Sequence, residues 1–227
     1  MKTAWNNANG WNRGVRRLWL RAWGAAAAVA AFGCLYFFVR QYFKDGVWLF
    51  DLALVNKSLG TASLFLLTLS MFLTGVAYFS NRGSRPLAFR KHYGLVGFWV
   101  GVAHAAVSHL LLPLWDLHPE RKTNAWLSDG PGVAALVLFA MMAAASNPSP
   151  KERLGGAAWR RLLRYTGYAG LVLSLGHTVA LKASSWTNYF RTFGSVIPSL
   201  SLPVALFAAA AVLLRLAVWV SQLRNRT

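Results

Sequence analysis

The sequence predicts an all-α integral membrane protein, a bundle of six transmembrane helices with both termini in the cytoplasm. Three observations predict it. Long apolar runs recur along the chain, basic residues gather in alternate connections between them, and two of the runs share a histidine-bearing motif. The composition agrees, because 56% of the 227 residues are hydrophobic and only 13% are charged. That is about half the charged fraction of a soluble domain.

Six segments are apolar and long enough to cross a bilayer, which takes about 20 helical residues. They cover residues 22–42, 58–80, 93–113, 131–146, 163–183 and 199–221. The fourth is short, and we expect it to begin within the preceding loop. The predicted organisation is a cytoplasmic arm (1–21), one six-helix domain (22–221) and a cytoplasmic tail (222–227).

Basic residues give the bundle a direction. The arm, the connections 81–92 and 147–164, and the tail carry sixteen Lys and Arg, whereas the connections on the other side carry seven. The more basic side of a membrane protein is normally cytoplasmic. We therefore interpret the net charge of +18 as an orientation signal and not as a nucleic-acid site. The expected location is a bacterial inner membrane.

The third and fifth segments contain nearly the same motif, "YGLVGFWVGVAH" (93–104) and "TGYAGLVLSLGH" (166–177). In each, small residues share or flank the helix face of the final histidine. They are Gly97 and Gly101 before His104, and Gly170 and Ser174 before His177. Both segments run in the same direction, so each histidine lies about 16 Å from the start of its motif.

Two imidazoles at one depth, with little side chain beside them, suit the two axial positions of a b-type haem. The small residues would leave room for the porphyrin. Two alternatives stay open: Gly-x-x-x-Gly is also a helix-packing device, and a membrane histidine can serve only as a hydrogen-bonding group. His92 has no matching histidine in the fifth segment, where residues 162–165 read "LLRY", so one haem per chain is expected.

Four stretches resemble the ferric-reductase-like transmembrane family, and within it the STEAP metalloreductases. They are "LVNKSL" (54–59), "RKHYGLVGFWVGVAH" (90–104), "SNPS" (146–149) and "TGYAGLVLSLGH" (166–177). The resemblance implies an oxidoreductase with one haem b held by His104 and His177, an FAD on the cytoplasmic side and a homotrimer. Electrons would pass to an external ferric or cupric complex.

The resemblance also directs attention to basic and polar groups at the two ends of the bundle. Candidate flavin contacts on the inner side, where donors suit a pyrophosphate, are Arg90, Lys91, His92, Ser146, Asn147, Lys151, Arg160 and Arg164. Ordinary positive-inside charge accounts for them equally well. Candidate contacts for an anionic metal chelate on the outer side are Arg121, Lys122, Lys182 and Arg191.

The chain also departs from the family. It has no G-x-G-x-x-G after a strand, the usual sign of a nicotinamide site, and it has His92 where the family has glutamine. Electrons are therefore expected from a separate flavin or NAD(P)H reductase, or from a quinol. One alternative is a quinol-fed haem subunit that serves an extracytoplasmic partner enzyme. An alternative of another class is a haemless transporter or assembly factor.

Overall fold

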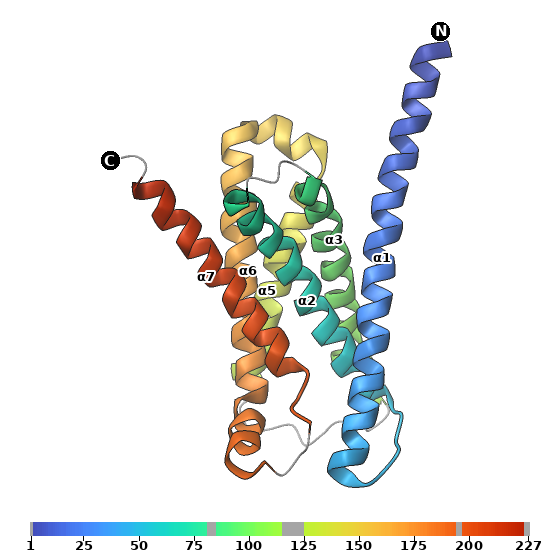
Figure 1. Cartoon of the computed structure of the whole chain (residues 1–227), viewed down its shortest axis with the longest axis vertical. Coiled ribbons are helices and arrows are strands. Elements are labelled where there is room, and N and C mark those ends of the chain that lie inside the picture. The colour runs from blue at the N-terminus through green and yellow to red at the C-terminus, as the bar shows by residue number, and fades with distance from the viewer. Residues whose placement is uncertain (1, 81–84, 115–124, 194–196, 225–227) are drawn as a thin grey trace.

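The computed structural model describes residues 2–80, 85–114, 125–193 and 197–224, and within these ranges all regular structure is helical. The helices run up and down in turn, so that the start of α1 and the end of α7 both lie toward the upper end of the molecule (Figure 1). They are α1 (Lys2–Asp45), α2 (Leu52–Phe79), α3 (Arg85–Ala106), η1 (Val107–Leu111), α4 (Leu112–Leu114), α5 (Ala125–Ala145), α6 (Pro148–Thr192) and α7 (Ser201–Arg224).

Four helical stretches are each long and apolar enough to cross a membrane: Gly14–Asp45, Leu52–Phe79, Leu87–Leu114 and Ser201–Arg224. α5 and α6 meet the same test only together, as a bent pair. The chain is therefore a helical protein with four, or up to five, candidate membrane spans. All six predicted spans fall on helices, but α5 is short and the first part of α6 is polar.

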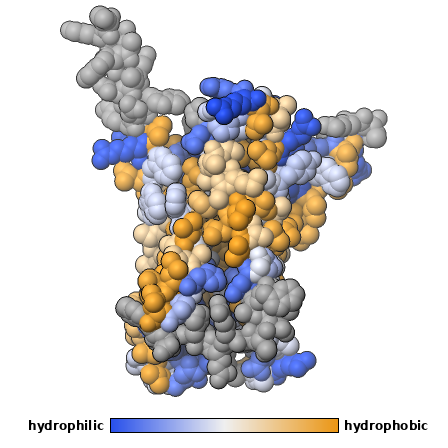
Figure 2. All heavy atoms as spheres, turned by 180° about the vertical axis from the view of Figure 1, so that it is seen from behind, coloured by the Kyte–Doolittle hydropathy of each residue, from blue (hydrophilic) through white to orange (hydrophobic). Residues whose placement is uncertain are grey.

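The surface agrees with a lipid environment. Figure 2 shows an apolar middle on one face of the molecule, with hydrophilic residues gathered mainly toward the upper end. Large apolar side chains stay exposed on the outermost helices, as Phe32 of α1 and Leu206 and Leu213 of α7 illustrate. A soluble protein rarely exposes such continuous apolar surface, and we assign it to contact with lipid.

α2 is the central helix, because it contributes to every buried cluster. The first cluster joins α1, α2 and α3 (Ala22, Ala26, Ala62, Leu66, Val96, Val100). The second joins α2, α6 and α7 (Leu64, Met71, Leu171, Val204, Ala208, Ala211), and the third joins α2, α3 and α5 (Leu67, Phe98, Ala135, Phe139). Small side chains at these contacts let the helices approach closely, as is usual in membranes.

Hydroxyl groups tie α2 to its neighbours. The Ser63 hydroxyl donates to the carbonyl oxygen of Gly97 (2.8 Å), and the Ser70 hydroxyl donates to that of Arg90 (2.7 Å). Both acceptors lie on α3. Interhelical hydrogen bonds of this kind stabilise packing where apolar burial provides no driving force.

Two local features shape the helices around the site. Pro113 has no N–H to donate to the carbonyl of His109, and this favours a break in the helix. The chain instead widens into the π-helical turn η1, in which the Leu112 N–H bonds to the carbonyl of Val107. On α6, Gly155 has a φ of 72°, outside the helical region, and it bends the helix near its start.

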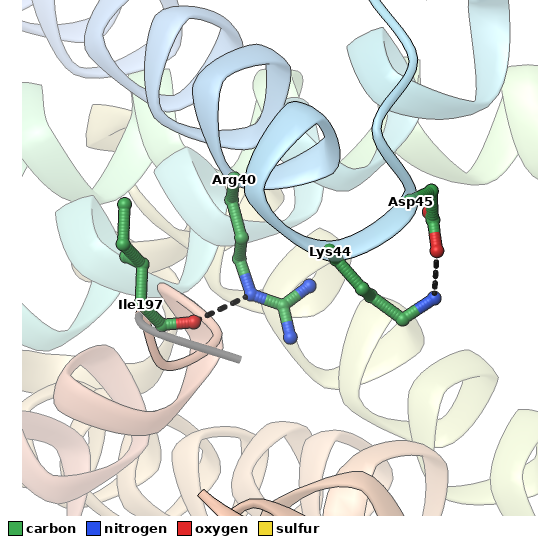
Figure 3. A network of polar contacts seen from close by, with 4 residues as sticks. All are labelled: Arg40, Lys44, Asp45 and Ile197. Atoms are coloured by element: carbon green, nitrogen blue, oxygen red, sulfur yellow. Dashed lines mark hydrogen bonds and ion pairs between the residues drawn. The ribbon is translucent and has the colours of Figure 1, made fainter. Parts of the chain in front are cut away.

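α1 is one helix from the predicted arm through the first span, so the expected boundary at residues 21 and 22 is not a structural break. Its lower end is fixed to the connection before α7. The Arg40 Nε donates to the carbonyl oxygen of Ile197 (3.1 Å), and the Tyr36 hydroxyl donates to that of Pro198 (2.8 Å). Figure 3 shows this arginine beside the exposed pair of Lys44 and Asp45.

Candidate functional site

Four helices that carry or contact the two histidines of the repeated motif form a ring. α2 packs extensively on α3 and α5 packs extensively on α6, and smaller contacts join α3 to α5 and α2 to α6. α3 and α6 therefore occupy opposite corners of the ring, with α2 and α5 between them (Figure 1). The sequence predicted these two helices side by side. In the structure each packs mainly on the helix that precedes it in the chain.

His104 of α3 is directed at α2. Its Nδ1 lies 2.8 Å from the side-chain oxygen Oδ1 of Asn56 and 3.0 Å from the backbone oxygen of the same residue. The Asn56 amide in turn donates to the hydroxyl of Ser108 (2.8 Å). Since both oxygens are acceptors, Nδ1 must carry the proton. The other ring nitrogen, Nε2, then holds a free lone pair.

Each imidazole also lies against a glycine of the neighbouring helix. A Cβ atom placed on Gly60 of α2 would lie 2.9 Å from Cε1 of His104, and one placed on Gly132 of α5 would lie 2.8 Å from Nδ1 of His177. Any larger residue would collide with the rings. Both imidazoles are half-buried, and His177 is within electrostatic range of His104.

The two glycines also place the histidines at similar depth. Gly60 lies eight residues after the start of α2 and Gly132 lies seven after the start of α5. Both helices begin at the lower end of the bundle (Figure 1). At about 1.5 Å per residue the glycines are about 12 Å and 10 Å along their helices.

The correspondence extends to whole helix pairs, because α2 with α3 repeats as α5 with α6. A spacing of 73 residues separates His104 from His177, Gly97 from Gly170, and Leu66 from Phe139. A Cβ on Gly97 would meet Leu66 Cβ at 3.1 Å, and one on Gly170 would meet the Phe139 ring at 3.0 Å. The sequence motif is therefore one half of a repeated helical hairpin.

The small residues of the motif pack against the neighbouring helices. Gly97 faces α2 and Gly170 faces α5. A Cβ placed on Gly101 would lie 2.8 Å from the hydroxyl oxygen of Ser63 on α2. These glycines permit close helix contact, as the packing alternative expects, and a neighbouring helix occupies the space beside them. Ser174 is half-buried, and its carbonyl accepts a hydrogen bond from the Thr178 hydroxyl (2.9 Å).

The candidate flavin contacts at the upper end fall into separate groups. Lys91 donates from its Nζ to the backbone oxygen of Ser146 (2.9 Å) at the end of α5. Lys151 lies over the ring of Trp159, 5.8 Å from its centre. Asn147 precedes α6, without a capping bond from its side chain, and Arg160 is exposed.

Two further candidates lie elsewhere at this end. His92 is buried edge-on against the Trp19 ring of α1, with 5.0 Å between ring centres, and its Nδ1 lies 3.1 Å from the carbonyl oxygen of Ala88. That position leaves little of its surface for a ligand. Arg90 and Arg164 instead interact electrostatically with Tyr168, so they form a third group.

Of the expected outer contacts, Arg121 and Lys122 lie outside the described residues. Lys182 is half-buried on α6 and within electrostatic range of His104, whereas Arg191 is exposed near the end of the same helix. Lys182 is thus the described outer cation that is associated with the paired histidines.

Sequence reasoning missed Asn56, Gly60, Gly132 and Arg215. A signal existed for the glycines, since one lies 44 residues before His104 and the other 45 before His177. Asn56 gave no such signal, because the second span was predicted to begin at residue 58, whereas α2 begins at Leu52.

The donor set can be compared with what a free metal ion and a haem each require. Among the described residues no group of three or more His, Cys, Asp or Glu side chains is placed to hold a metal. A haem would need two nitrogen donors, and His104, whose Nδ1 is bonded to Asn56, and His177 are the residues that would supply them. Because Gly60 and Gly132 lack side chains, each imidazole can lie close to the backbone of the neighbouring helix.

The chain matches no protein-family model and no curated protein sequence. The relationship to the ferric-reductase-like family therefore remains a resemblance carried by the motifs, and the function is argued from the site.

Proposed function

We propose that the chain is a haem b protein that carries electrons across a membrane to a ferric or cupric complex. His104 and His177 are the axial ligands of a single haem. Reduced FAD, recharged by a separate reductase, is the donor at the upper end, where α3 and α6 begin. All six predicted spans cross the membrane, with both termini in the cytoplasm. A bacterial inner membrane is the proposed location.

The observation that carries the proposal is the matched setting of the two imidazoles. Each lies on a glycine of the preceding helix, at similar depth, on opposite corners of one ring of helices. Helix packing alone does not require a histidine at both places. Hydrogen bonding alone does not require a glycine beside both rings.

The bonding of His104 supports the ligand role further. Ligand histidines commonly donate their second ring N–H to a carbonyl or carboxylate, which fixes the tautomer and the ring plane. Asn56 offers two such oxygens to Nδ1. When bound, a b haem supplies a one-electron carrier between the two ends of the bundle. Lys182, on the same outer half of α6, supplies positive charge that attracts an anionic metal chelate.

The absorption spectrum of the full-length protein tests the ligand assignment. We expect a Soret band that sharpens and shifts on dithionite reduction, as for iron with two imidazole ligands. His104→Ala and His177→Ala should each lose it. His109→Ala is the matched control, because His109 is exposed on the adjoining turn η1 and should keep the wild-type spectrum.

Haem content equal to wild type in either ligand variant refutes the assignment. A wild-type protein that takes up no haem on reconstitution supports a haemless transporter or assembly factor instead. In proteoliposomes, reduced FAD on one side should lead to reduction of ferric citrate on the other. Reduction by a quinol, with no effect of FAD, would assign the chain as a quinol-fed subunit.

A further inference from the structure

A cavity at the upper end of the bundle gathers positive charge. It has a volume of about 380 Å³ and lies between the ends of α2, α3, α6 and α7, within the range of about 300–1,000 Å³ that is usual for ligand sites. Arg164 and Arg215 line it, together with the apolar side chains of Leu87 and Val218. No carboxylate is among its described lining residues.

A third guanidinium belongs to the same group. The guanidinium carbon of Arg215 lies 5.5 Å from the centre of the Tyr168 ring. Arg90 and Tyr168 each interact electrostatically with both Arg164 and Arg215. Arg90 and Arg215 are half-buried and Arg164 is exposed. Like charges that are partly shielded from water repel more strongly than in water, so this arrangement favours an anion between them.

Nothing in the described part of the chain supplies that anion. The pair of Lys44 and Asp45 lies at the end of α1, at the opposite end of the molecule (Figure 1). Thr74 also lines the cavity, but its hydroxyl oxygen is buried away from the accessible surface, so Arg164 and Arg215 are the charged donors that a ligand in the cavity can reach. Two guanidinium groups at one cavity are donors that suit a phosphate.

We propose that Arg164 and Arg215 bind a phosphate group in this cavity, and that an anionic phospholipid of the adjoining leaflet supplies it. Guanidinium groups bind phosphate oxygens in pairs, and basic pockets between membrane helices bind anionic headgroups. The apolar side chains of Leu87 and Val218 suit the glycerol and acyl part of a lipid. A soluble phosphate ester, FMN for example, offers the same group, and the experiment separates the two sources.

The site does not depend on haem. Arg90 and Arg164 are among the candidate flavin contacts, but Arg215 is not, since the sequence places it inside the last apolar span. Its position there is costly for a charged group. An anion bound at the cavity would explain why an arginine occupies this position in an apolar span.

The test uses the full-length protein, delipidated in detergent and incubated with phosphatidylglycerol or phosphatidylcholine. Native mass spectrometry counts the bound lipid. We expect one phosphatidylglycerol to be retained in clear preference to phosphatidylcholine. Arg215→Gln and Arg164→Gln should each weaken its retention about tenfold, as expected for a lost charge-assisted hydrogen bond.

Arg161→Gln is the matched control, because Arg161 is exposed on the same helix and does not line the cavity. Circular dichroism reports whether each variant is folded. Because Arg164 is exposed, its substitution should affect folding little. Equal retention of both lipids, or unchanged retention in Arg215→Gln and Arg164→Gln, overturns the proposal. Displacement of the lipid by micromolar FMN, with the same loss in both variants, keeps the phosphate site but overturns its lipid source.

Discussion

A methyl group added at Gly60 or at Gly132 should remove haem from the protein while the helices remain folded. Gly60→Ala would place its Cβ 2.9 Å from Cε1 of His104, and Gly132→Ala would place its Cβ 2.8 Å from Nδ1 of His177. Carbon atoms pack at about 3.5–4.0 Å. The His104 ring must therefore move away by about 0.6–1.1 Å, judged from that contact range.

The cost of this movement can be estimated from the contacts of the ring. His104 is held by Asn56 through Nδ1 at 2.8 and 3.0 Å, and a shift of this size strains those bonds. Adding a methyl group to a packed interior costs about 1–3 kcal/mol. If the whole of this cost goes into displacing the His104 ring, haem affinity falls about 5- to 150-fold. Alanine is the better helix former by about 0.5–1 kcal/mol, so the helix itself is not weakened.

The measurement is the haem-to-protein ratio after purification and after titration with free haem. Gly176→Ala is the matched control, since Gly176 adjoins His177 in the sequence but nothing lies within 4 Å of the position that its Cβ would take. We expect wild-type haem content there and reduced content in the two test variants, with unchanged circular dichroism in all three. Full haem content in both Gly60→Ala and Gly132→Ala would refute the idea that these glycines seat the ligand rings.

Three more substitutions test the fold around the site. Gly97→Ala brings a Cβ within 3.1 Å of the backbone nitrogen of Leu67 and should cost about 1–3 kcal/mol of stability. The midpoint of thermal unfolding should fall. Loss of haem before unfolding would contradict a packing role. Gly155→Ala must adopt a φ of 72° in open space, so backbone strain alone should cost about 1–2 kcal/mol in thermal unfolding, whereas Gly156→Ala should be neutral. Lys91→Met removes a cation from the end of α5 and should lower stability by about 0.3–1 kcal/mol, an effect that high salt should reduce in the wild type.

The sequence predicts the helices well because each carries its own signal. Apolar runs of about 20 residues, separated by basic connections, are sufficient to locate them. The extent of α1 is an exception. The basic arm differs in composition from the first span, but arginines are good helix formers, so a change of composition at residue 21 does not interrupt the helix.

The neighbours of the site were harder to predict. The motif gives the face and the depth of each histidine, but it does not say which helix that face contacts. In the structure the glycines of the motif pack against α2 and α5. α3 and α6 lie on opposite sides of the ring of four helices. The same spacing of 73 residues that relates the two motifs also relates Leu66 to Phe139, so the repeat could have been extended to the preceding helices.

The repeat leads to a prediction about the second ligand. Asn56, one turn before Gly60, accepts the hydrogen bond of His104. The residue 73 positions later is Asp129, which stands three residues before Gly132 on α5. A Cβ placed on Gly132 would lie 2.8 Å from Nδ1 of His177, so this nitrogen is close to α5. We therefore expect Asp129 to accept the Nδ1 proton of His177.

This would make the two axial ligands unequal. A carboxylate acceptor raises the basicity of a ligand imidazole, more than a neutral amide does, and so favours the oxidised iron. Asp129→Asn should raise the reduction potential, and Asn56→Asp should lower it. Changes to such supporting partners also weaken metal binding by about 10- to 100-fold. Ser108→Ala is the control, because its hydroxyl accepts a hydrogen bond from the amide of Asn56 (2.8 Å), whereas His104 is held by the oxygens of Asn56. A potentiometric titration in which Asp129→Asn matches the wild type would show that the second histidine is held by some other group, and that the two hairpins repeat in backbone packing but not in the support of their ligands.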